Sequence, residues 1–308
     1  MTIKISFKNF SKIILVVPAF VFLAGFSFPQ EATSQNTSTE TKPTKILVVP
    51  GHDNEYPGAI VGYGKADGSA IREADINLKI GAYLKSFLEK DLAFEVYTTR
   101  DADFIKTDTE NNQDKNGYTD YFQKYLDENI LDVLNFRQEY KKQTEKTLKN
   151  KNSRKSSDPK IEHNPAPGEM AYRLYAINKF IEDNQIDIVI HIHLNDYPGR
   201  TGISGEYKGF SIYVPDNTLR NGKKSQALSK YIAKTLDDNF KYSNNPVEKK
   251  KIILGHELIA NGSNNTIAAA SVLIEYGYIY EQKFQDEETL KMAAEQTYAG
   301  IKNYLTKN

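Results

Sequence analysis

Short apolar runs alternate with amphipathic stretches from residue 45 to the end of the chain. Five runs have the length, the β-branched content and the flanking turn residues that predict strands: 46–49, 94–98, 186–192, 210–214 and 272–274. Other stretches place apolar residues at helical spacing, around 76–87, 170–181, 228–232 and 290–305. Strands that alternate with helices predict a layered α/β domain with a largely parallel sheet.

The first 34 residues do not share this pattern. Lysines precede the apolar run 13–28, and the small-residue sequence Ala32-Thr33-Ser34 follows it. These features predict a signal peptide, or else an N-terminal anchor; the run is short for a spanning helix and contains Pro18, which favours cleavage. Residues 35–44 are polar and read as a linker, so residues 45–308 form the expected folded domain. The predicted signal implies export to the periplasm, cell wall or extracellular space.

Residues 104–168 interrupt the alternation and are predicted to be an insertion. A helical pattern runs from Phe122 to Tyr140, and residues 141–160 then carry eight Lys or Arg against Glu145 and Asp158. Such a run attracts anionic polymers. A solvated helix end followed by a disordered loop explains it more simply.

Composition limits the possible chemistry. Lys plus Arg and Asp plus Glu each number 40, so the formal net charge is zero. Balanced charge supplies no field toward nucleic acid, and no recognised nucleic-acid module appears, so no nucleic-acid partner is expected. Cysteine is absent, which excludes disulfides, a thiolate nucleophile and a Cys-ligated zinc site. Any metal here must use His, Asp or Glu.

Histidine and glutamate occur where the predicted elements end or begin. His52 follows strand 46–49, and ligands of open α/β sheets gather outside the carboxyl ends of strands. Glu73 opens the helix around 76–87; alone, it reads as an acid that interacts with the helix dipole. His191 and His193 end the most apolar strand and share a face, because residues two apart in a strand point the same way. Together, two histidines and one glutamate favour a metal site.

Such a set suits Zn²⁺ and leaves a fourth position for water. Zinc lowers the pKa of that water and polarises a carbonyl. A hydrolase also needs a proton acceptor, and Glu275 follows the apolar run 272–274. Burying a carboxylate there costs free energy unless the group is paired with a cation or takes part in catalysis. The alternative to a catalytic role is therefore a buried ion pair.

Several motifs in order resemble the zinc-dependent N-acetylmuramoyl-L-alanine amidases of the type 3 class, over roughly residues 45–307. The likeness rests on segments 46–52, 72–78, 99–101, 192–195 and 272–277, with Arg173 between them. The resemblance implies zinc ligands at His52, Glu73 and His193 and a catalytic Glu275. It also implies a three-layer fold with a twisted six-stranded sheet, and cleavage of the amide bond between N-acetylmuramic acid and L-alanine by zinc-activated water.

The chain departs from the family pattern beside the first ligand. Asp53-Asn54-Glu55 stand where two glycines usually follow the first histidine, which makes the rim more acidic and bulkier. The stretch around Arg137 also aligns with the motif assigned to Arg173.

A second departure lies on the strand of the third ligand. In the family a serine is common at the position of His191. We therefore assign His191 to substrate binding or to orienting a metal ligand. As an alternative, His191 is the zinc ligand in place of His193. Asn195 and Tyr276 adjoin the proposed catalytic residues and are also assigned to substrate binding.

Two other functions remain open from the residues alone. A zinc carboxypeptidase or endopeptidase acting on stem peptides would use the same metal set, and a non-catalytic wall-binding protein would keep the fold. The expected partner is peptidoglycan, with membrane contact only through an uncleaved N-terminal segment. We expect a monomer.

Overall fold

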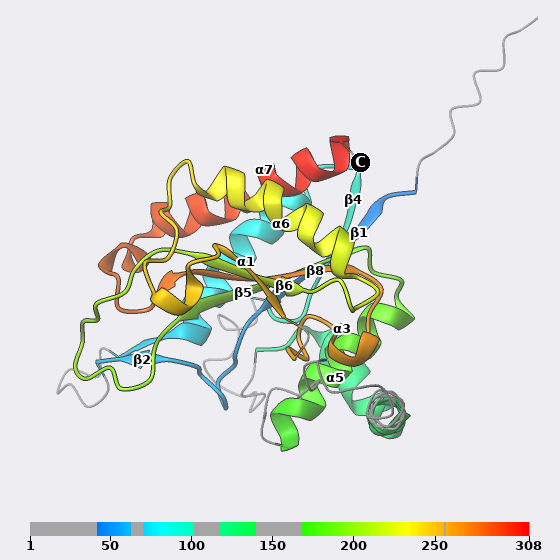
Figure 1. The fold of residues 1–308 in the computed structure, drawn as a ribbon. Helices are drawn as coiled ribbons and strands as arrows, with labels where there is room; N and C mark the ends of the chain where they lie inside the picture. The colour runs from blue at the N-terminus through cyan, green and yellow to red at the C-terminus, as the bar shows by residue number, and fades with distance from the viewer. Residues whose placement is uncertain (1–41, 63–69, 102–116, 140–167, 256, 308) are drawn as a thin grey trace, which may run out of the picture. The chain divides into compact units, whose positions relative to one another are not determined.

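Six strands form one sheet in the order β4-β1-β5-β8-β6-β7 (Figure 1). They are β1 (Thr44–Pro50), β4 (Phe94–Thr98), β5 (Ile188–Asn195), β6 (Ser211–Pro215), β7 (Ile252–Gly255) and β8 (Ala270–Tyr278). Neighbouring strands run parallel except β6 and β8, which are antiparallel. The carboxyl ends of β1, β4, β5 and β8 therefore meet at one edge, and the predicted mostly parallel sheet is confirmed.

The computed structural model describes residues 42–62, 70–101, 117–139, 168–255 and 257–307. The predicted signal peptide or anchor at 1–34, most of the linker and the basic run at 141–160 lie outside the described residues. Strand β1 begins at Thr44, one residue before the predicted start of the domain.

Helices cover both faces of the sheet (Figure 1). One face packs against α1 (Glu73–Leu88), α6 (Gly222–Leu236) and α7 (Glu287–Lys307), and the other against α3 (Asp120–Glu128) and α5 (Gly168–Asp183). These helices cover the residues predicted from apolar spacing, and the three-layer α/β class is confirmed. Each layer buries an apolar cluster, which supplies the main driving force for folding.

Alternation along the strands decides which side chains reach which layer. In β5, Ile190 and Ile192 belong to the core beside α1, α6 and α7, whereas Val189 belongs to the core beside α5. Side chains two apart share a face, so His191 and His193 are directed to the α5 side. The strand pattern thus separates a structural face from the face that carries polar groups.

Short elements complete the described chain. A two-stranded hairpin pairs β2 (Ile60–Val61) with β3 (Ile71–Arg72), directly before α1. Three 3₁₀ turns follow later: η1 (Pro246–Glu248), η2 (Ser263–Asn265) and η3 (Gln282–Gln285).

Part of the predicted insertion packs on the domain core. Helix α3 and a helical stretch at 130–139 carry Phe122, Leu126 and Val133 into the cluster beside α5. Residues 117–139 therefore contribute to one of the two helical layers. This agrees with the helical pattern that begins at Phe122 in the sequence.

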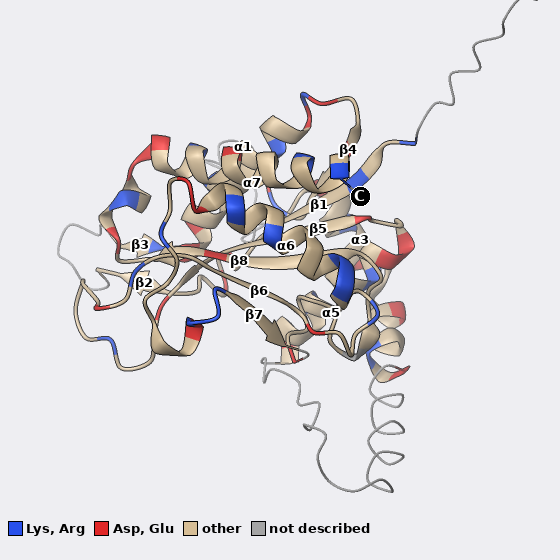
Figure 2. Ribbon diagram, turned by 45° about the horizontal axis from the view of Figure 1, so that its top comes forward, with Lys and Arg blue, Asp and Glu red and all other residues tan. Residues whose placement is uncertain are grey.

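Charged residues are spread over the described elements. Lys and Arg are interspersed with Asp and Glu along the helices and loops (Figure 2). The arrangement matches the balanced composition of the chain. Among the helices that the structure describes, none is both long enough and apolar enough to cross a membrane.

Candidate metal centre and active site

His52, Glu73 and His193 come together at the carboxyl edge of the sheet. Glu73 Oε1 lies 3.1 Å from His52 Nε2 and 3.2 Å from His193 Nδ1. One donor atom from each of the three residues lies within 4.8 Å of the other two. Among the described residues, this is the group of His, Asp and Glu side chains arranged closely enough to hold a metal ion.

Two of the three separations between donor atoms fit a tetrahedral zinc ion. Ligands at about 2.0–2.1 Å around a tetrahedral centre are separated by about 3.3 Å. The two nitrogen-to-oxygen separations in the cluster, 3.1 and 3.2 Å, are close to that value. Two imidazoles and one carboxylate are also a donor set that zinc takes in hydrolases, with the fourth position left for water.

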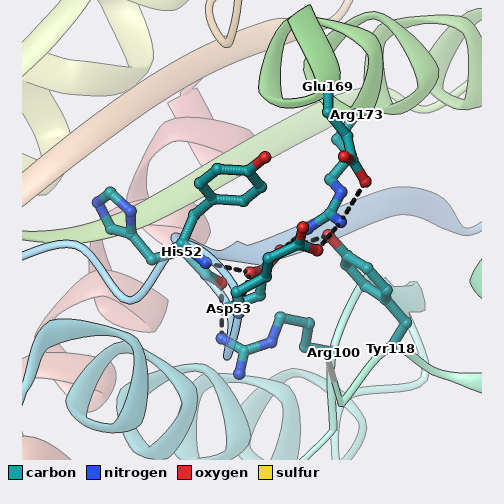
Figure 3. Close-up of polar contacts among 8 residues, drawn as sticks. His52, Asp53, Arg100, Tyr118, Glu169 and Arg173 are labelled. Atoms are coloured by element: carbon teal, nitrogen blue, oxygen red, sulfur yellow. Dashed lines mark hydrogen bonds and ion pairs between the residues drawn. The ribbon is translucent and has the colours of Figure 1, made fainter. Parts of the chain in front are cut away.

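His52 is held in an uncommon backbone conformation directly after β1. Its φ is 64°, in the left-handed region that residues other than glycine seldom adopt. Its carbonyl accepts a 2.7 Å hydrogen bond from Arg100 Nη1 (Figure 3), and the preceding Gly51 donates its N–H to the Ile192 carbonyl at 2.8 Å. The backbone on both sides of the imidazole is therefore tied to neighbouring elements.

Gly51 also makes room for the imidazole of His193. A Cβ atom at this position would lie 2.3 Å from the ring of His193. Only glycine allows β1 to end this close to the imidazole. The residue before the first histidine thus has a steric role in the cluster.

Glu73 is the first residue of α1 and is 4% exposed. Besides the two histidines, its carboxylate accepts hydrogen bonds from the backbone N–H of Ala59 and Leu194 and from Asn77 Nδ2, at 3.0 to 3.2 Å. Burial would raise its pKa, but hydrogen bonds from His193 and His52 and their charges outweigh burial and lower the pKa of Glu73. The position keeps this carboxylate ionised, as a metal ligand must be.

The two histidines of β5 occupy different surroundings. His193 faces the cluster, whereas His191 is 1% exposed and its ring is hydrogen-bonded to the backbone of Ala260. Burial lowers the pKa of His191 to about 3, and the charge of His193 acts in the same direction, so this imidazole is neutral. The structure groups His193, not His191, with His52 and Glu73.

Glu275 lies beside the cluster on the adjacent strand. It pairs in register with His193 across β5 and β8, and its Oε2 is buried without a hydrogen-bond partner. Burial raises the pKa of Glu275, and the negative charges of Glu73 and Glu248 raise it further. This carboxylate forms no ion pair with any described residue, so a buried ion pair, the alternative to a catalytic role, has no support in the described part of the chain.

Glu248 is a buried carboxylate near the site that the sequence pattern did not predict. It lies at the end of η1, is 1% exposed, and accepts four hydrogen bonds. The donors are Asn195 Nδ2 at 2.5 Å, the hydroxyls of Tyr213 and Tyr278 at 2.9 Å each, and the Ser243 hydroxyl. Its segment is polar and irregular, so the sequence pattern supplies no signal for it, and three of its four donors come from the distant strands β5, β6 and β8.

The Asn195 side chain donates a hydrogen bond to Glu248, whereas the Tyr276 side chain points away from the His52–Glu73–His193 cluster. The Tyr276 side chain is fully buried, and its hydroxyl lies 2.7 Å from Thr297 Oγ1 in α7. Since Glu275 faces the α5 side, the next residue in β8 must face the opposite side. This is contrary to the expectation that Tyr276 binds substrate.

Asp53 anchors the loop after His52 to α5. Its Oδ2 accepts hydrogen bonds from Arg173 Nη1 at 2.5 Å and from the Tyr118 hydroxyl at 2.9 Å, while Glu169 pairs with the same guanidinium at 2.8 Å. Figure 3 shows this network with the His52 ring turned away from it. Asp53, which stands where a glycine was expected from the resemblance, thus forms an ion pair with Arg173.

Arg137, the other candidate for the Arg173 motif, lies elsewhere. Its guanidinium lies 5.8 Å from the ring centroid of Tyr175. Arg173, by contrast, reaches the loop that carries His52 through Asp53. The structure therefore places Arg173 in the site region.

A cavity of about 220 Å³ adjoins the cluster on the α5 side. His52 and His193 form part of its wall, and His191 faces it. Most other wall residues are apolar and come from β1, α5, β8 and the segment before η2, among them Val49, Leu174, Ile177, Leu258, Ile259 and Leu273. A concave, mostly apolar space with a few polar groups is typical of a binding site.

The fold and the cluster together define an α/β protein with a candidate zinc hydrolase centre. A family model described as N-acetylmuramoyl-L-alanine amidase matches residues 46–303. The chain therefore belongs to the N-acetylmuramoyl-L-alanine amidase family, the peptidoglycan hydrolases indicated by its motifs. The predicted enzyme class, which cleaves the amide bond between N-acetylmuramic acid and L-alanine of the stem peptide, is confirmed.

Solved structures share the fold. The CwlD amidase from Clostridioides difficile, solved in complex with the GerS lipoprotein, is 21% identical with a TM-score of 0.51, over 86% of this chain and 100% of that one. The Ami1 amidase from Mycobacterium smegmatis is 12% identical with a TM-score of 0.51, over 86% of this chain and 98% of that one. No curated protein sequence matched the chain.

Proposed function

We propose that His52, Glu73 and His193 hold a zinc ion and that Glu275 is the proton-transfer residue of the amidase reaction. The observation that carries the proposal is the register pairing of His193 and Glu275, which sets a metal-ligand candidate beside an unpaired carboxylate oxygen. The convergence of the three donors supports the ligand set. Family membership supports the reaction.

Each residue has a defined task in this proposal. When bound, zinc lowers the pKa of a water molecule and polarises the scissile carbonyl. Glu275 accepts the proton of the attacking water and passes it to the leaving nitrogen of L-alanine. Glu73 and the two histidines fix the position of the reacting centre, and no covalent bond forms between enzyme and substrate.

The surroundings of Glu275 suit this transfer. Its buried oxygen has no hydrogen-bond donor among the described residues, so the oxygen is available to a water molecule. Burial and the negative charges of Glu73 and Glu248 raise the pKa of Glu275, which favours uptake of a proton by this carboxylate.

We also place the enzyme outside the cytoplasm, on peptidoglycan. The support is the apolar N-terminal segment with its preceding lysines, together with the substrate of the family. Asn195, held by Glu248 at the edge of the site, is assigned to substrate contact.

Replacing Glu275 with glutamine tests the assignment. Glu275→Gln keeps the shape of the side chain but cannot accept the proton, so turnover of purified peptidoglycan should fall by about 10²-fold or more while zinc content stays at one ion per chain. Glu128→Gln, at an exposed position of α3, is the matched control and should retain full activity. Near-normal turnover by Glu275→Gln would refute the role of Glu275.

A further inference from the structure

We propose that the tyrosine cluster at the base of loop 196–208 is a saccharide subsite, which binds the glycan strand of peptidoglycan next to the reacting centre. The tyrosine cluster comprises Tyr197, Tyr207, Tyr278 and Tyr280. The subsite rests on the proposed function, because it serves the reaction only if the adjacent candidate metal centre is the reacting centre. It deepens that function by assigning the sugar side of the substrate to one surface of the protein.

The four rings of the tyrosine cluster pack against one another. Ring centroids lie 4.8 Å apart for Tyr197 and Tyr207, 6.1 Å for Tyr197 and Tyr280, and 5.5 Å for Tyr278 and Tyr280. Tyr278 is buried, whereas the other three rings are partly exposed. The Tyr280 hydroxyl donates to the Tyr207 carbonyl at 2.7 Å, which joins the two segments that carry the rings. The exposed rings therefore have a buried ring and a hydrogen bond to hold them in place.

The tyrosine cluster lies at the same edge of the sheet as the candidate metal centre. Asn195, two residues beyond His193, pairs in register with Tyr278 across β5 and β8. Tyr278 lies three residues beyond Glu275, about 10 Å along the strand. The buried Glu248 accepts hydrogen bonds from both Asn195 and Tyr278. One pair of strands therefore carries both the proposed reacting groups and the buried ring of the tyrosine cluster.

Loop 196–208 is also tied to the segment that leads into Glu73. Arg200 Nη2 donates to the Ile60 carbonyl in β2 at 3.2 Å. Ala59, the residue before Ile60, donates its N–H to Glu73 Oε2 at 3.0 Å. Figure 1 shows the loop after β5 running beside β2. The loop thus borders the metal centre from the side of the β2–β3 hairpin.

Tyr280 is occupied by contacts within the loop. The Arg200 guanidinium, paired with Asp196 at 2.6 and 2.8 Å, lies 5.5 Å from the ring centroid of Tyr280. Gly205 packs on the same ring, since a Cβ atom there would lie 2.3 Å from it. We therefore assign contact with the ligand to the other two partly exposed rings, Tyr197 and Tyr207.

A polymer needs an open surface and not a small cavity. The muramic acid that reacts is one unit of a glycan strand that continues in both directions, whereas the cavity on the α5 side has a volume of about 220 Å³. On the side of the loop, residues 198–199 and 201–206 are exposed. The glycan strand therefore fits along the loop, and the cavity is left for smaller groups next to the scissile bond.

The chemistry of the loop also suits a sugar. Sugar rings carry faces of C–H groups, which pack on aromatic rings, and hydroxyl groups at their edges, which form hydrogen bonds. Tyr197 and Tyr207 supply the rings, each with an apolar body and a polar tip. The carboxylates of Asp196 and Glu206 in the same loop supply acceptors for hydroxyl groups. A stem peptide offers no comparable flat face, so the tyrosine cluster favours the glycan.

Binding to an inactive enzyme tests the subsite without turnover. In the zinc-loaded full chain carrying Glu275→Gln, calorimetry measures the Kd of two ligands: a chain of four sugars with one stem peptide, and the same stem peptide alone. Tyr207→Leu removes the ring and should weaken binding of the four-sugar ligand roughly 5- to 10-fold, because the apolar surface that a sugar covers is lost. Tyr207→Phe keeps the ring and should stay within twofold. The Kd of the free peptide should be unchanged in both variants.

Tyr231→Leu is the matched control. Tyr231 is a partly exposed tyrosine of α6, and its ring centroid lies 6.2 Å from that of Tyr304. Helix α6 packs on the face of the sheet opposite to α5, away from the cavity. Its replacement should leave both Kd values unchanged. Zinc content and melting temperature of each variant show that the metal centre and the fold are retained.

Two results would overturn the subsite. One is an unchanged Kd of the four-sugar ligand in Tyr207→Leu, and the other is an equal loss for the free peptide, which would mean that the ring supports the site and not a sugar. Should Tyr207→Leu fail to fold, Tyr197→Leu takes its place. The two ligands also decide in the chain that keeps all its tyrosines, where equal Kd values contradict the proposal. Failure of the proposed function appears differently, as turnover of peptidoglycan by Glu275→Gln.

Discussion

His193 and Glu275 lie directly opposite each other in the neighbouring parallel strands β5 and β8. The sheet's hydrogen bonds therefore fix the distance between a proposed metal ligand and the proposed proton-transfer residue. Sites built on strands hold their geometry better than sites built on loops. His52 lacks that support, and its position depends on the contacts made by Gly51, Arg100 and Asp53.

Enlarging Gly51 should disturb the metal centre. In Gly51→Ala the added methyl would lie 2.3 Å from the His193 ring, so either the imidazole or the end of β1 must move. We expect zinc affinity, measured by competition with a chelator, to fall at least about tenfold, because misplacing one ligand costs more than 1.4 kcal/mol.

Gly168→Ala is the matched control for this change. The control position opens α5, and a methyl there meets nothing within 4 Å. It should leave zinc affinity unchanged and the fold as stable as before. Equal zinc affinity for Gly51→Ala and wild type would show that the contact with His193 does not limit the site.

Removing the hydroxyl of Tyr276 should affect stability and not catalysis. Tyr276→Phe loses the hydrogen bond with Thr297 Oγ1, but that threonine still donates to the Ala293 carbonyl at 2.9 Å. We expect the free energy of unfolding, measured with urea, to fall by about 0.5–1.5 kcal/mol. Because the side chain faces α7, kcat/KM should stay within twofold of wild type. A tenfold loss of kcat/KM would indicate that Tyr276 takes part in substrate binding or catalysis.

Glu248 should matter for both stability and turnover. Glu248→Ala leaves the buried hydroxyls of Tyr213 and Tyr278 and the amide of Asn195 without their shared acceptor. We expect the free energy of unfolding to fall by about 1–3 kcal/mol for each buried donor that is left unsatisfied.

Glu248→Gln separates the two effects of that residue. It retains one acceptor oxygen, so it should recover most of the stability, while the released Asn195 amide should still lower kcat/KM. Urea unfolding of both variants, with steady-state kinetics of the glutamine variant, checks this. Wild-type kcat/KM for Glu248→Gln would mean that the carboxylate serves the fold alone.

The sequence predicted the parts of the fold that follow from periodicity. The predicted strands at 46–49 and 94–98 correspond to β1 and β4, and the predicted helix around 76–87 corresponds to α1. These elements were predictable because a buried face requires apolar residues at a regular spacing. Strand β7 was not predicted: it has four residues, follows three lysines and lies at the sheet edge, where burial imposes little pattern.

The candidate site was predictable where a residue adjoins a strand end or a helix start. His52 and Glu73 were selected in that way, and the structure brings them to one point. Tyr276 was misassigned although alternation in β8 already turns it away from Glu275. The roles of Glu248 and of the Asp53–Arg173 ion pair could not be predicted from the sequence, because each depends on contacts between segments far apart in the chain.

The central claim is that this chain uses zinc to cut the bond between N-acetylmuramic acid and L-alanine. The most direct measurement incubates the purified chain with peptidoglycan, with and without a chelator, and analyses the fragments by mass spectrometry. We expect glycan chains that keep their lactyl groups and free peptides that begin with L-alanine, both lost with chelator and restored by added zinc. Cleavage within the stem peptide, or turnover that a chelator does not affect, would contradict the account.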